Sequence, residues 1–405
     1  MKEFGRKNFK YTAYFNFDAT EELSREFENT KDPSRIIEVL KLYVEVPIIP
    51  GETLIIFDEI QQCNKALNSL KYFCEDAPQY HVMAAGSLLG VALSGGDSFP
   101  VGKVDFLNMY PISFREFLRV ADRKIFDYVE NIDRISSLPE IVNNRLTEVY
   151  RQYEICGGLP ASASAMLEGN GIEKISNILQ GLLDSYEFDF SKHAPTSQIP
   201  RIADIWNSIP SQLARENRKF VYKLVKPGAR AREYEDSLLW LQQAGLIYKI
   251  FCCSRPGLPL KAYDDLSAFK IYMFDIGILR QLAKLPAEVF LQDNPLYREF
   301  KGAVTENYVL QSLIPECEVE PRYWVSNGTA EVDFLLQHSL SVIPAEVKAG
   351  TNTAGKSLSV YIGKYNPDLA IVFSGQQLAL KDNVLYIPLT MACWTRRLIS
   401  IALTK

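Results

Sequence analysis

The chain has 405 residues, is 47% hydrophobic and carries a formal net charge of −5, which predicts two or three domains with well-filled cores. No apolar run approaches the length of a membrane span and the N-terminus has no apolar signal core, so we expect a cytoplasmic protein. Seven cysteines without a CxxC pair and three scattered histidines argue against a disulfide framework, a zinc site and a His-based triad.

The first informative segment is the apolar run at residues 54–57, which is followed directly by Asp58 and Glu59. Four apolar residues are too few for a buried helix, and Pro50 and Gly51 mark the start of the run, so we predict a central strand of a parallel sheet. At the carboxyl end of such a strand, one carboxylate can hold Mg²⁺ while the other activates water, as in P-loop ATPases. The alternative is a surface turn after a core strand.

The following elements favour the ATPase interpretation. Residues 61–77 are polar and compatible with a helix, and residues 80–87 form a second predicted buried strand, which ends in Ser87. A polar side chain at this position could touch the γ-phosphate or the attacking water of an ATPase.

Four segments together resemble one family, the prokaryotic AAA-type P-loop ATPases that carry a nuclease-like C-terminal domain of undefined function. They are FDEIQ at 57–61, AAGSLLG at 84–90, FPVGKV at 99–104 and YPISFREFL at 110–118. The resemblance implies that Mg²⁺ and ATP are the cofactors, with Asp58 on the metal, Glu59 activating water and Ser87 sensing the γ-phosphate. Arg115 and Arg151 are both candidates for an arginine finger.

Members of this family open with a strand and a Gly-rich loop that ends in Gly-Lys-Thr or Gly-Lys-Ser and cradles the phosphates. In this chain, the first residues resemble the helix after that loop, and residues 11–17 resemble the second strand. We therefore expect an N-terminally truncated member without Walker A, because of a misassigned start or a lost 5′ end. Such a chain is expected to bind ATP poorly or not at all.

Residues 350–357 (GTNTAGKS) match the Walker A pattern and follow an apolar strand predicted at residues 342–347. However, the match lies about 290 residues after Asp58 instead of before it, and a phosphate loop here would need a permuted fold. The preceding strand also has another explanation, so we do not predict a working phosphate loop at this position.

That explanation is a hairpin of two apolar strands. It brings Asp333 and Glu346 into one region and places Lys348 on the same strand face as Glu346. Carboxylates that hold Mg²⁺ beside a lysine suit metal-dependent phosphodiester hydrolysis. The pattern resembles the PD-(D/E)XK nuclease core, with Glu306 matching the acid of its first helix and Val332 replacing its proline. The alternative is an exposed hairpin in which Glu346 and Lys348 form a surface ion pair. A nuclease-type fold would also not by itself establish cleavage, because fold does not determine activity.

Between these regions, residues 126–193 have a helical pattern, at the place where the family has a small lid. Predicted helices at 202–213 and 229–244, followed by a strand at 246–252, indicate a winged helix. Seven cations crowd into this region: Arg215, Arg218, Lys219, Lys223, Lys226, Arg230 and Arg232. They could neutralise DNA phosphates. Alternatively, they form a solvated face of a protein-docking module, or hold the nucleotide of the ATPase domain.

We therefore predict an α/β chain with a truncated AAA-type domain (1–125), a helical lid (126–195), a winged helix (196–262) and a restriction-endonuclease-like domain (263–405). The predicted function is that of an ATPase-family protein coupled to a nuclease-like domain and impaired in ATP binding. Two alternatives stay open. One is a non-catalytic DNA- or protein-binding adaptor, and the other is a metal-dependent nuclease that needs no ATP.

Overall fold

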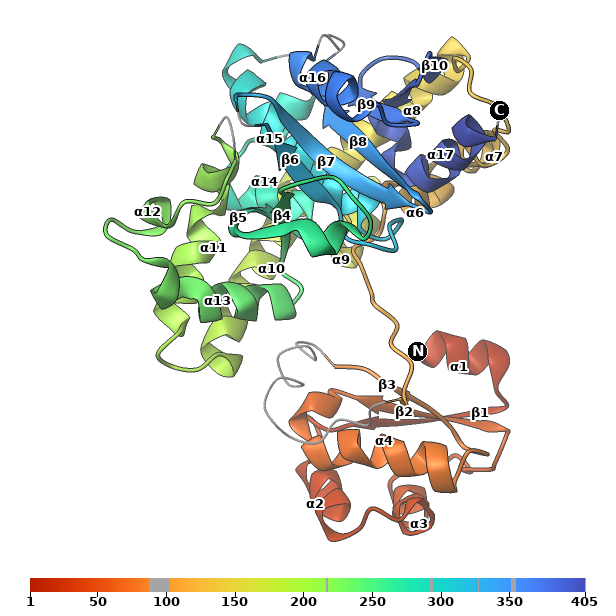
Figure 1. Ribbon diagram of the computed structural model, residues 1–405. Coiled ribbons are helices and arrows are strands. Elements are labelled where there is room, and N and C mark those ends of the chain that lie inside the picture. Colours follow the sequence, from red (N-terminus) through yellow and green to blue (C-terminus); the bar gives the residue numbers. More distant parts are fainter. Residues whose placement is uncertain (87–101, 216–217, 292–293, 327, 351–354, 405) are drawn as a thin grey trace. The chain divides into compact units, whose positions relative to one another are not determined.

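A three-stranded parallel sheet forms the centre of the N-terminal part of the chain (Figure 1). Its strands are β1 (Tyr11–Asn16), β2 (Thr53–Asp58) and β3 (His81–Ala84), in the order β1-β2-β3. The parallel register pairs Asn16 with Asp58, so the polar ends of β1 and β2 meet at the same edge of the sheet. The strand predicted at residues 54–57 is therefore confirmed, and it is the central one.

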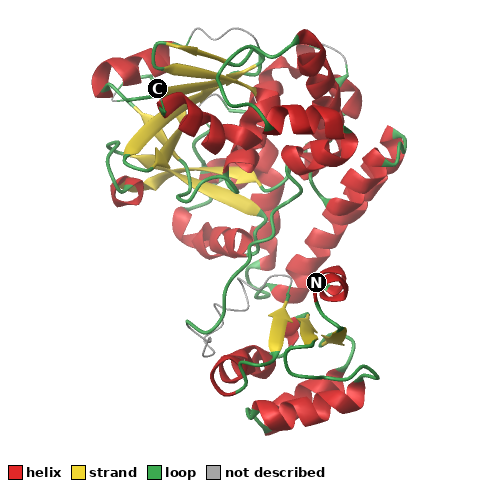
Figure 2. Cartoon of the chain, turned by 90° about the vertical axis from the view of Figure 1, so that its right-hand side faces the viewer, coloured by secondary structure: helices red, strands yellow, loops and turns green. Residues whose placement is uncertain are grey.

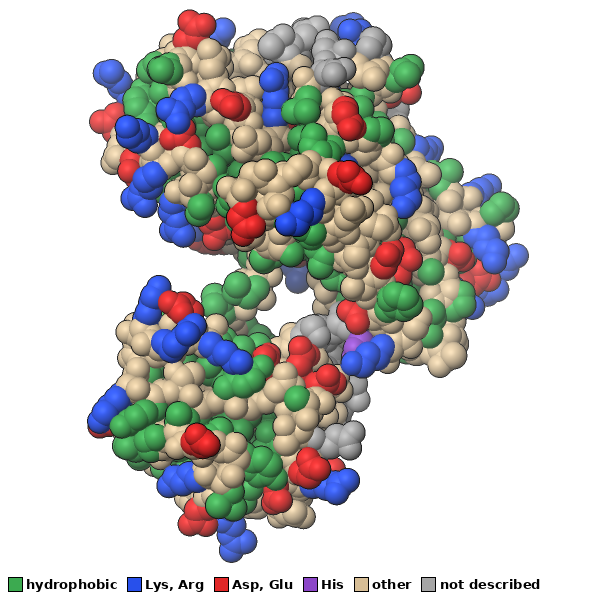
Figure 3. Space-filling view, turned by 180° about the vertical axis from the view of Figure 1, so that it is seen from behind, with side chains coloured by type: hydrophobic (Ala, Val, Ile, Leu, Met, Phe, Trp, Pro, Cys, Tyr) green, Lys and Arg blue, Asp and Glu red, His purple; other side chains and the backbone are tan. Residues whose placement is uncertain are grey.

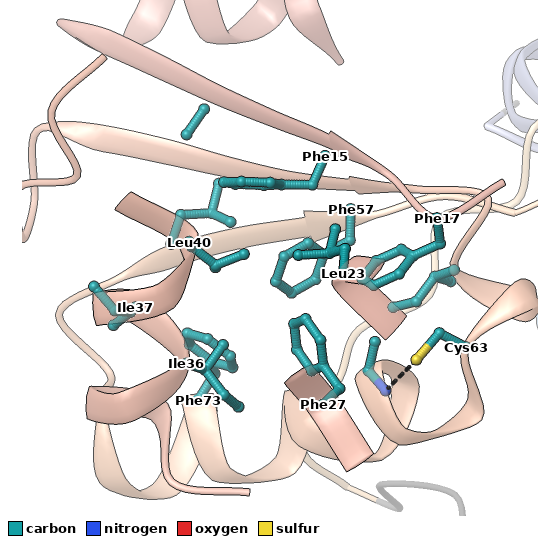
Figure 4. Close-up of a cluster of buried hydrophobic side chains, with 14 of the residues drawn as sticks. Phe15, Phe17, Leu23, Phe27, Ile36, Ile37, Leu40, Phe57, Cys63 and Phe73 are labelled. Carbon is teal, nitrogen blue, oxygen red and sulfur yellow. Dashed lines mark hydrogen bonds between the residues drawn. The ribbon is translucent and has the colours of Figure 1, made fainter. Parts of the chain in front are cut away.

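An aromatic core holds three helices against one face of this sheet (Figure 4). Rings from the strands and helices meet edge to face in this core, with Phe57 at the centre of contacts to Phe17, Phe27 and Phe73. The helices are α2 (Glu21–Asn29), α3 (Pro33–Tyr43) and α4 (Asn64–Asp76), and α1 (Lys2–Asn8) packs against β1. Burial of these large rings is the main source of stability for this sheet.

The computed structural model describes residues 1–86, 102–215, 218–291, 294–326, 328–350 and 355–404. The chain divides into a first unit, residues 1–109, and a second unit, residues 110–405 apart from the turn at 243–245. Within the described ranges, no helix is both long enough and apolar enough to cross a membrane.

The second unit begins with five helices, which confirms the helical pattern of residues 126–193. They are α6 (Phe114–Ala121), α7 (Arg123–Glu130), α8 (Glu140–Cys156), α9 (Pro160–Leu167) and α10 (Ile172–His193). Helix α6 starts with a capping box, in which the Ser113 hydroxyl accepts from the Glu116 N–H and the Glu116 carboxylate accepts from the Ser113 N–H. This reciprocal pair explains why the helix begins where it does.

Three further helices precede a hairpin. The helices are α11 (Ile199–Leu213), α12 (Tyr222–Val225) and α13 (Ala231–Gln243), and the antiparallel hairpin consists of β4 (Ile247–Cys253) and β5 (Asp264–Met273). Strand β4 also pairs with β6, through Cys252 opposite Tyr323. The hairpin is therefore part of a large sheet and not a free wing.

That sheet has eight strands in the order β10-β11-β9-β8-β7-β6-β4-β5. Figure 2 draws the strands in yellow, with red helices beside them. The C-terminal strands are β6 (Arg322–Val325), β7 (Glu331–His338), β8 (Ser341–Val347), β9 (Ala370–Ser374), β10 (Ala379–Lys381) and β11 (Val384–Pro388). The helices are α14 (Ile276–Leu282), α15 (Arg298–Leu313), α16 (Lys356–Tyr365) and α17 (Thr395–Leu403). Short 3-10 helices are η1 (Ile60–Gln62), η2 (Leu260–Tyr263), η3 (Ala287–Phe290), η4 (Pro295–Tyr297) and η5 (Leu389–Trp394).

Helix α15 is joined to the end of the hairpin and to the start of α14 through buried polar side chains. The Asn307 amide accepts from the Met273 N–H at 2.8 Å and donates to the Met273 carbonyl at 2.9 Å. Gln311 accepts from the Ile276 N–H at 3.0 Å. These bonds satisfy the backbone hydrogen-bonding groups where β5 ends and α14 begins.

The predicted domain boundaries at residues 125, 195 and 262 stay predictions. All of residues 126–405 except the turn at 243–245 lie in the second unit.

The fully buried Asp275 carboxylate organises the start of α14. It accepts from the Gly158 N–H at 2.6 Å, the Ile278 N–H at 3.0 Å and the Gln311 side-chain amide at 3.3 Å. Burial raises the pKa of this carboxyl, although the hydrogen bonds lower it. Asp275 thereby links α14 and α15 to the turn between α8 and α9.

Candidate functional site

Asp58 and Glu59 lie together at the carboxyl end of the central strand β2. Asp58 is half-buried, and its Oδ1 accepts from the Glu59 N–H at 3.1 Å. Its Oδ2 accepts from the Tyr14 hydroxyl on the neighbouring strand at 2.5 Å. The carboxylate is therefore held in one orientation at the edge of the sheet where α/β proteins bind ligands.

Glu59 turns the chain sharply after the strand. Its φ of 52° is in the left-handed region, which is uncommon for a residue with a side chain and is often found at functional sites. The Gln61 side-chain amide donates to the Glu59 carboxylate at 2.6 Å. This bond holds the half-buried Glu59 side chain in the turn that directly follows Asp58.

The end of β3 lies directly beside this turn. The Ala85 N–H donates to the Phe57 carbonyl at 2.8 Å, and the Ile60 N–H donates to the Ala85 carbonyl at 3.0 Å. A Cβ at Gly86 would come within 2.2 Å of the Gln61 Oε1, so Gly86 permits the close approach of the two segments. Ser87, the predicted γ-phosphate sensor, lies outside the described residues.

Sequence reasoning missed Tyr14. Its hydroxyl donates to Asp58, and this hydrogen bond raises the pKa of Tyr14. Asn16 donates to the same hydroxyl at 3.4 Å, and the Lys2 Nζ lies 3.3 Å from the centre of the Tyr14 ring. The available signal was the alternation of β1, which turns Tyr14 and Asn16 to the face opposite Phe15.

The donor set around Asp58 fits Mg²⁺. The ion prefers oxygen ligands, and in nucleotide sites it is bound by one or two carboxylates together with the phosphates and water. Asp58 offers a half-buried carboxylate with a fixed orientation. Each of its oxygens keeps a lone pair beyond the hydrogen bond that it accepts from a described residue. Asp58 would therefore hold the ion, with Glu59 next to it.

In the second unit, Asp333, Glu346 and Lys348 come together at one end of the β7–β8 hairpin. The Asp333 Oδ2 accepts from the Val347 N–H at 2.8 Å, and the Lys348 Nζ lies 2.5 Å from the Glu346 Oε1. The hairpin thus has the predicted residues side by side. Within the part of the chain that the structure describes, no group of three or more His, Cys, Asp or Glu side chains is placed to hold a metal ion.

The segment that matches the Walker A pattern lies between β8 and α16, and residues 351–354 of it are outside the described ranges. The Glu346 Oε2 accepts from the Leu358 N–H at 3.2 Å, in the first turn of α16. A Cβ at Gly355 would be 2.8 Å from the same oxygen. A carboxylate therefore occupies the helix N-terminus that a phosphate would need, which argues against a phosphate loop at this position.

Glu306 lies in a different set of contacts, a buried charge cluster that we call the Glu306 cluster. It consists of Glu306, Lys270, Tyr272, Arg218 and Glu331. Tyr272 and Arg218 both donate to the Glu306 carboxylate, and the Lys270 Nζ lies 3.3 Å from its Oε1. Lys270 is also 2.5 Å from the Glu331 Oε1. Among the described contacts of Glu306, none joins it to Asp333, Glu346 or Lys348.

The centre of the cluster is shielded from solvent, since Lys270 is fully buried and Glu306 is 1% exposed. Burial raises the pKa of Glu331, and the positive charge of Lys270 opposes this shift. Two acids, Glu306 and Glu331, therefore neutralise two bases, Lys270 and Arg218, inside the protein.

Arg115, one of the two arginine-finger candidates, forms a bidentate ion pair with Glu130, at 2.6 and 3.0 Å.

Three parts of the chain match known families. Residues 1–118 match a family described as an AAA domain. Residues 147–289 match a domain of unknown function (DUF8612), and residues 301–392 match another (DUF4143). No curated protein matches the chain.

Among solved structures, this chain is similar to a Walker-type ATPase of Pyrococcus abyssi. The match covers 69% of this chain and 93% of the chain of that ATPase, with 15% sequence identity and a TM-score of 0.40. The α/β fold class is confirmed, with a parallel N-terminal sheet, a helical region and a mixed C-terminal sheet. Residues 1–118 are similar to AAA domains, whereas the nuclease-like C-terminal domain stays a prediction.

Proposed function

We propose that the first unit supplies the hydrolytic half of an AAA-type ATPase site. The observation that carries this proposal is the adjacency of two carboxylates at the carboxyl end of the central parallel strand. Asp58 is oriented there by Tyr14 and by the Glu59 N–H. The match of residues 1–118 to AAA domains supports the same assignment.

The two acids have different tasks. Asp58 binds Mg²⁺, which neutralises developing charge on the phosphates when bound. Glu59 accepts a proton from the attacking water or orients it, and Gln61 holds the Glu59 side chain in position. Tyr14 keeps the Asp58 carboxylate at the sheet edge.

The affinity for ATP is expected to be weak. Residues 1–118 contain no Gly-rich loop that ends in Gly-Lys-Thr or Gly-Lys-Ser, so the backbone amides that usually cradle the phosphates are not provided within this segment. Assays therefore need millimolar Mg-ATP.

Glu59→Gln is expected to lower ATP hydrolysis about 10²- to 10⁴-fold, because the amide cannot accept a proton from water. Phosphate release from millimolar Mg-ATP by the full chain measures this, and equilibrium dialysis checks that ATP binding is unchanged. Glu45→Gln, an exposed acid of the same unit, is the matched control. If the wild type releases phosphate no faster than Glu59→Gln, the proposal is wrong.

A second candidate is metal-dependent nucleic-acid cleavage at Asp333, Glu346 and Lys348. Their proximity supports it, but the Glu306 carboxylate is already bound by Lys270, Tyr272 and Arg218. Magnesium-dependent nicking of plasmid DNA by the full chain would favour this candidate over a non-catalytic adaptor. The contacts of Glu306 favour the non-catalytic adaptor over the nuclease, because a carboxylate bound by Lys270, Tyr272 and Arg218 is not available to a metal ion.

A further inference from the structure

The segment from Arg215 to Arg232 carries six exposed cations, which we call the basic connector. They are Arg215, Lys219, Lys223, Lys226, Arg230 and Arg232. Within the described ranges, none of these six side chains forms a salt bridge. In Figure 3, Lys and Arg side chains gather with a few acidic ones at the right-hand edge, where the α12 region lies.

The seventh cation of this segment, Arg218, has a different role. Its guanidinium contacts the Glu306 carboxylate, and its Nε donates to the Leu213 carbonyl at 3.2 Å. Only 16% of the side chain is exposed. Arg218 therefore anchors the connector to the interior and is not available to an external ligand.

Further bonds fix the backbone on either side of this anchor. The Phe220 N–H donates to the Phe269 carbonyl at 2.8 Å, and the Gln212 side chain bonds both the N–H and the carbonyl of Val221. The connector is thus tied to β5 and α11 at its inner residues, while its cations face outward. A fixed backbone lowers the entropic cost of binding an extended ligand.

We propose that the basic connector binds the phosphate backbone of duplex DNA without reading its sequence. The cations are spread over eighteen residues. They therefore suit an extended polyanion, whose condensed counterions are released on binding. This surface is independent of the site at Asp58, so either proposal can fail without the other.

The exposed face of α13 explains why sequence is not read. In a winged helix this helix enters the major groove. Here Arg232 is exposed in the first turn of α13, but the outward residues that follow it include Glu235, Asp236 and Leu239. Beyond the first turn, these two carboxylates would repel the phosphates that line the groove, so only the start of α13 belongs to the basic connector. In addition, β4 is paired with β6, so the hairpin is not free to act as a wing.

Aromatic packing favours a duplex over a single strand. Single-stranded nucleic acid is held by stacking of bases on exposed aromatic rings. The aromatic residues of the connector are Phe220 and Tyr222, whose rings pack against each other and against Phe269. Contacts are therefore expected to the phosphates alone.

The test is fluorescence anisotropy of the full chain with two 20-base-pair duplexes of unrelated sequence, over a series of salt concentrations. Six phosphate contacts predict a slope of about −5 in log K against log salt, and similar affinity for both duplexes. Lys219→Gln/Lys223→Gln is expected to reduce the slope by about 2 and to weaken binding of both duplexes equally.

The matched control is Lys41→Gln/Lys65→Gln, which removes the same charge from exposed lysines of the first unit. It should leave the slope unchanged. Equal slopes for the wild type and Lys219→Gln/Lys223→Gln would overturn the proposal, as would an affinity difference of a hundredfold between the two duplexes. Binding of polyglutamate but not of duplex would assign the surface to an acidic protein instead.

Discussion

Replacing Lys270 by Met is expected to destabilise the second unit by about 3–5 kcal/mol. The side chain is fully buried between two carboxylates, at 3.3 Å from Glu306 and 2.5 Å from Glu331. Removing one partner of a buried ion pair leaves the other charge without compensation in a medium of low dielectric. All four tryptophans lie in the second unit, so tryptophan fluorescence during urea denaturation reports its unfolding.

Two further variants make this result specific. Lys174→Met removes an exposed lysine of the same unit and should change the free energy of unfolding by less than about 0.5 kcal/mol. Lys270→Met/Glu331→Gln removes the stranded charge and should recover part of the loss. A cost of 1 kcal/mol or less for Lys270→Met would show that the Glu306 cluster does not hold α15 to β5.

Gly157→Ala is expected to cost about 3–5 kcal/mol in the same assay. Gly157 has φ 66° and ψ −164°, a region that is essentially restricted to glycine. A Cβ there would also lie 2.4 Å from the Asp275 Oδ1 and 2.7 Å from the Gly277 backbone nitrogen. Neither atom can move away, since one belongs to a buried hydrogen-bonded carboxylate and the other to the backbone.

Gly169→Ala measures the cost of a positive φ where a Cβ meets no close neighbour. Gly169 also has a positive φ, of 76°, but a Cβ there would have no heavy atom within 4 Å. Its cost should be only the conformational strain of about 1–2 kcal/mol. If both alanine variants lose the same stability, close packing around Asp275 contributes nothing at Gly157.

The sequence predicted those parts of the molecule that depend on local patterns. The apolar run before Asp58 identified the central strand β2, and the polar turn between two apolar runs identified the β7–β8 hairpin. Period-two and helical spacings are properties of neighbouring residues, so they are readable without knowledge of the fold. The proximity of Asp333 to Glu346 followed from the hairpin alone.

The contacts that could not be predicted join residues far apart in the chain. Tyr14 reaches Asp58 only because of the β1–β2 register. Arg218 lies between α11 and α12 and reaches Glu306 on α15, with α12, α13, the β4–β5 hairpin and α14 among the elements between them in the chain. Charge composition gave Arg218 the same role as its neighbours, although it is the only one of the seven with a salt bridge among the described contacts. The pairing of β4 with β6 likewise joins distant segments. The entropic cost of closing a loop rises only slowly with its length, so sequence separation does not determine which strands pair.

The magnesium dependence of ATP binding tests the central claim most directly. We expect Mg²⁺ to raise the affinity of the full chain for ATP at least about tenfold, and Asp58→Asn to abolish this increase, because an amide is a poorer ligand than a carboxylate. Asp76→Asn, an exposed acid of the same unit, should behave as the wild type. Equilibrium dialysis with and without Mg²⁺ gives the answer. An equal magnesium effect in the wild type and in Asp58→Asn would contradict the assignment of the metal site to Asp58.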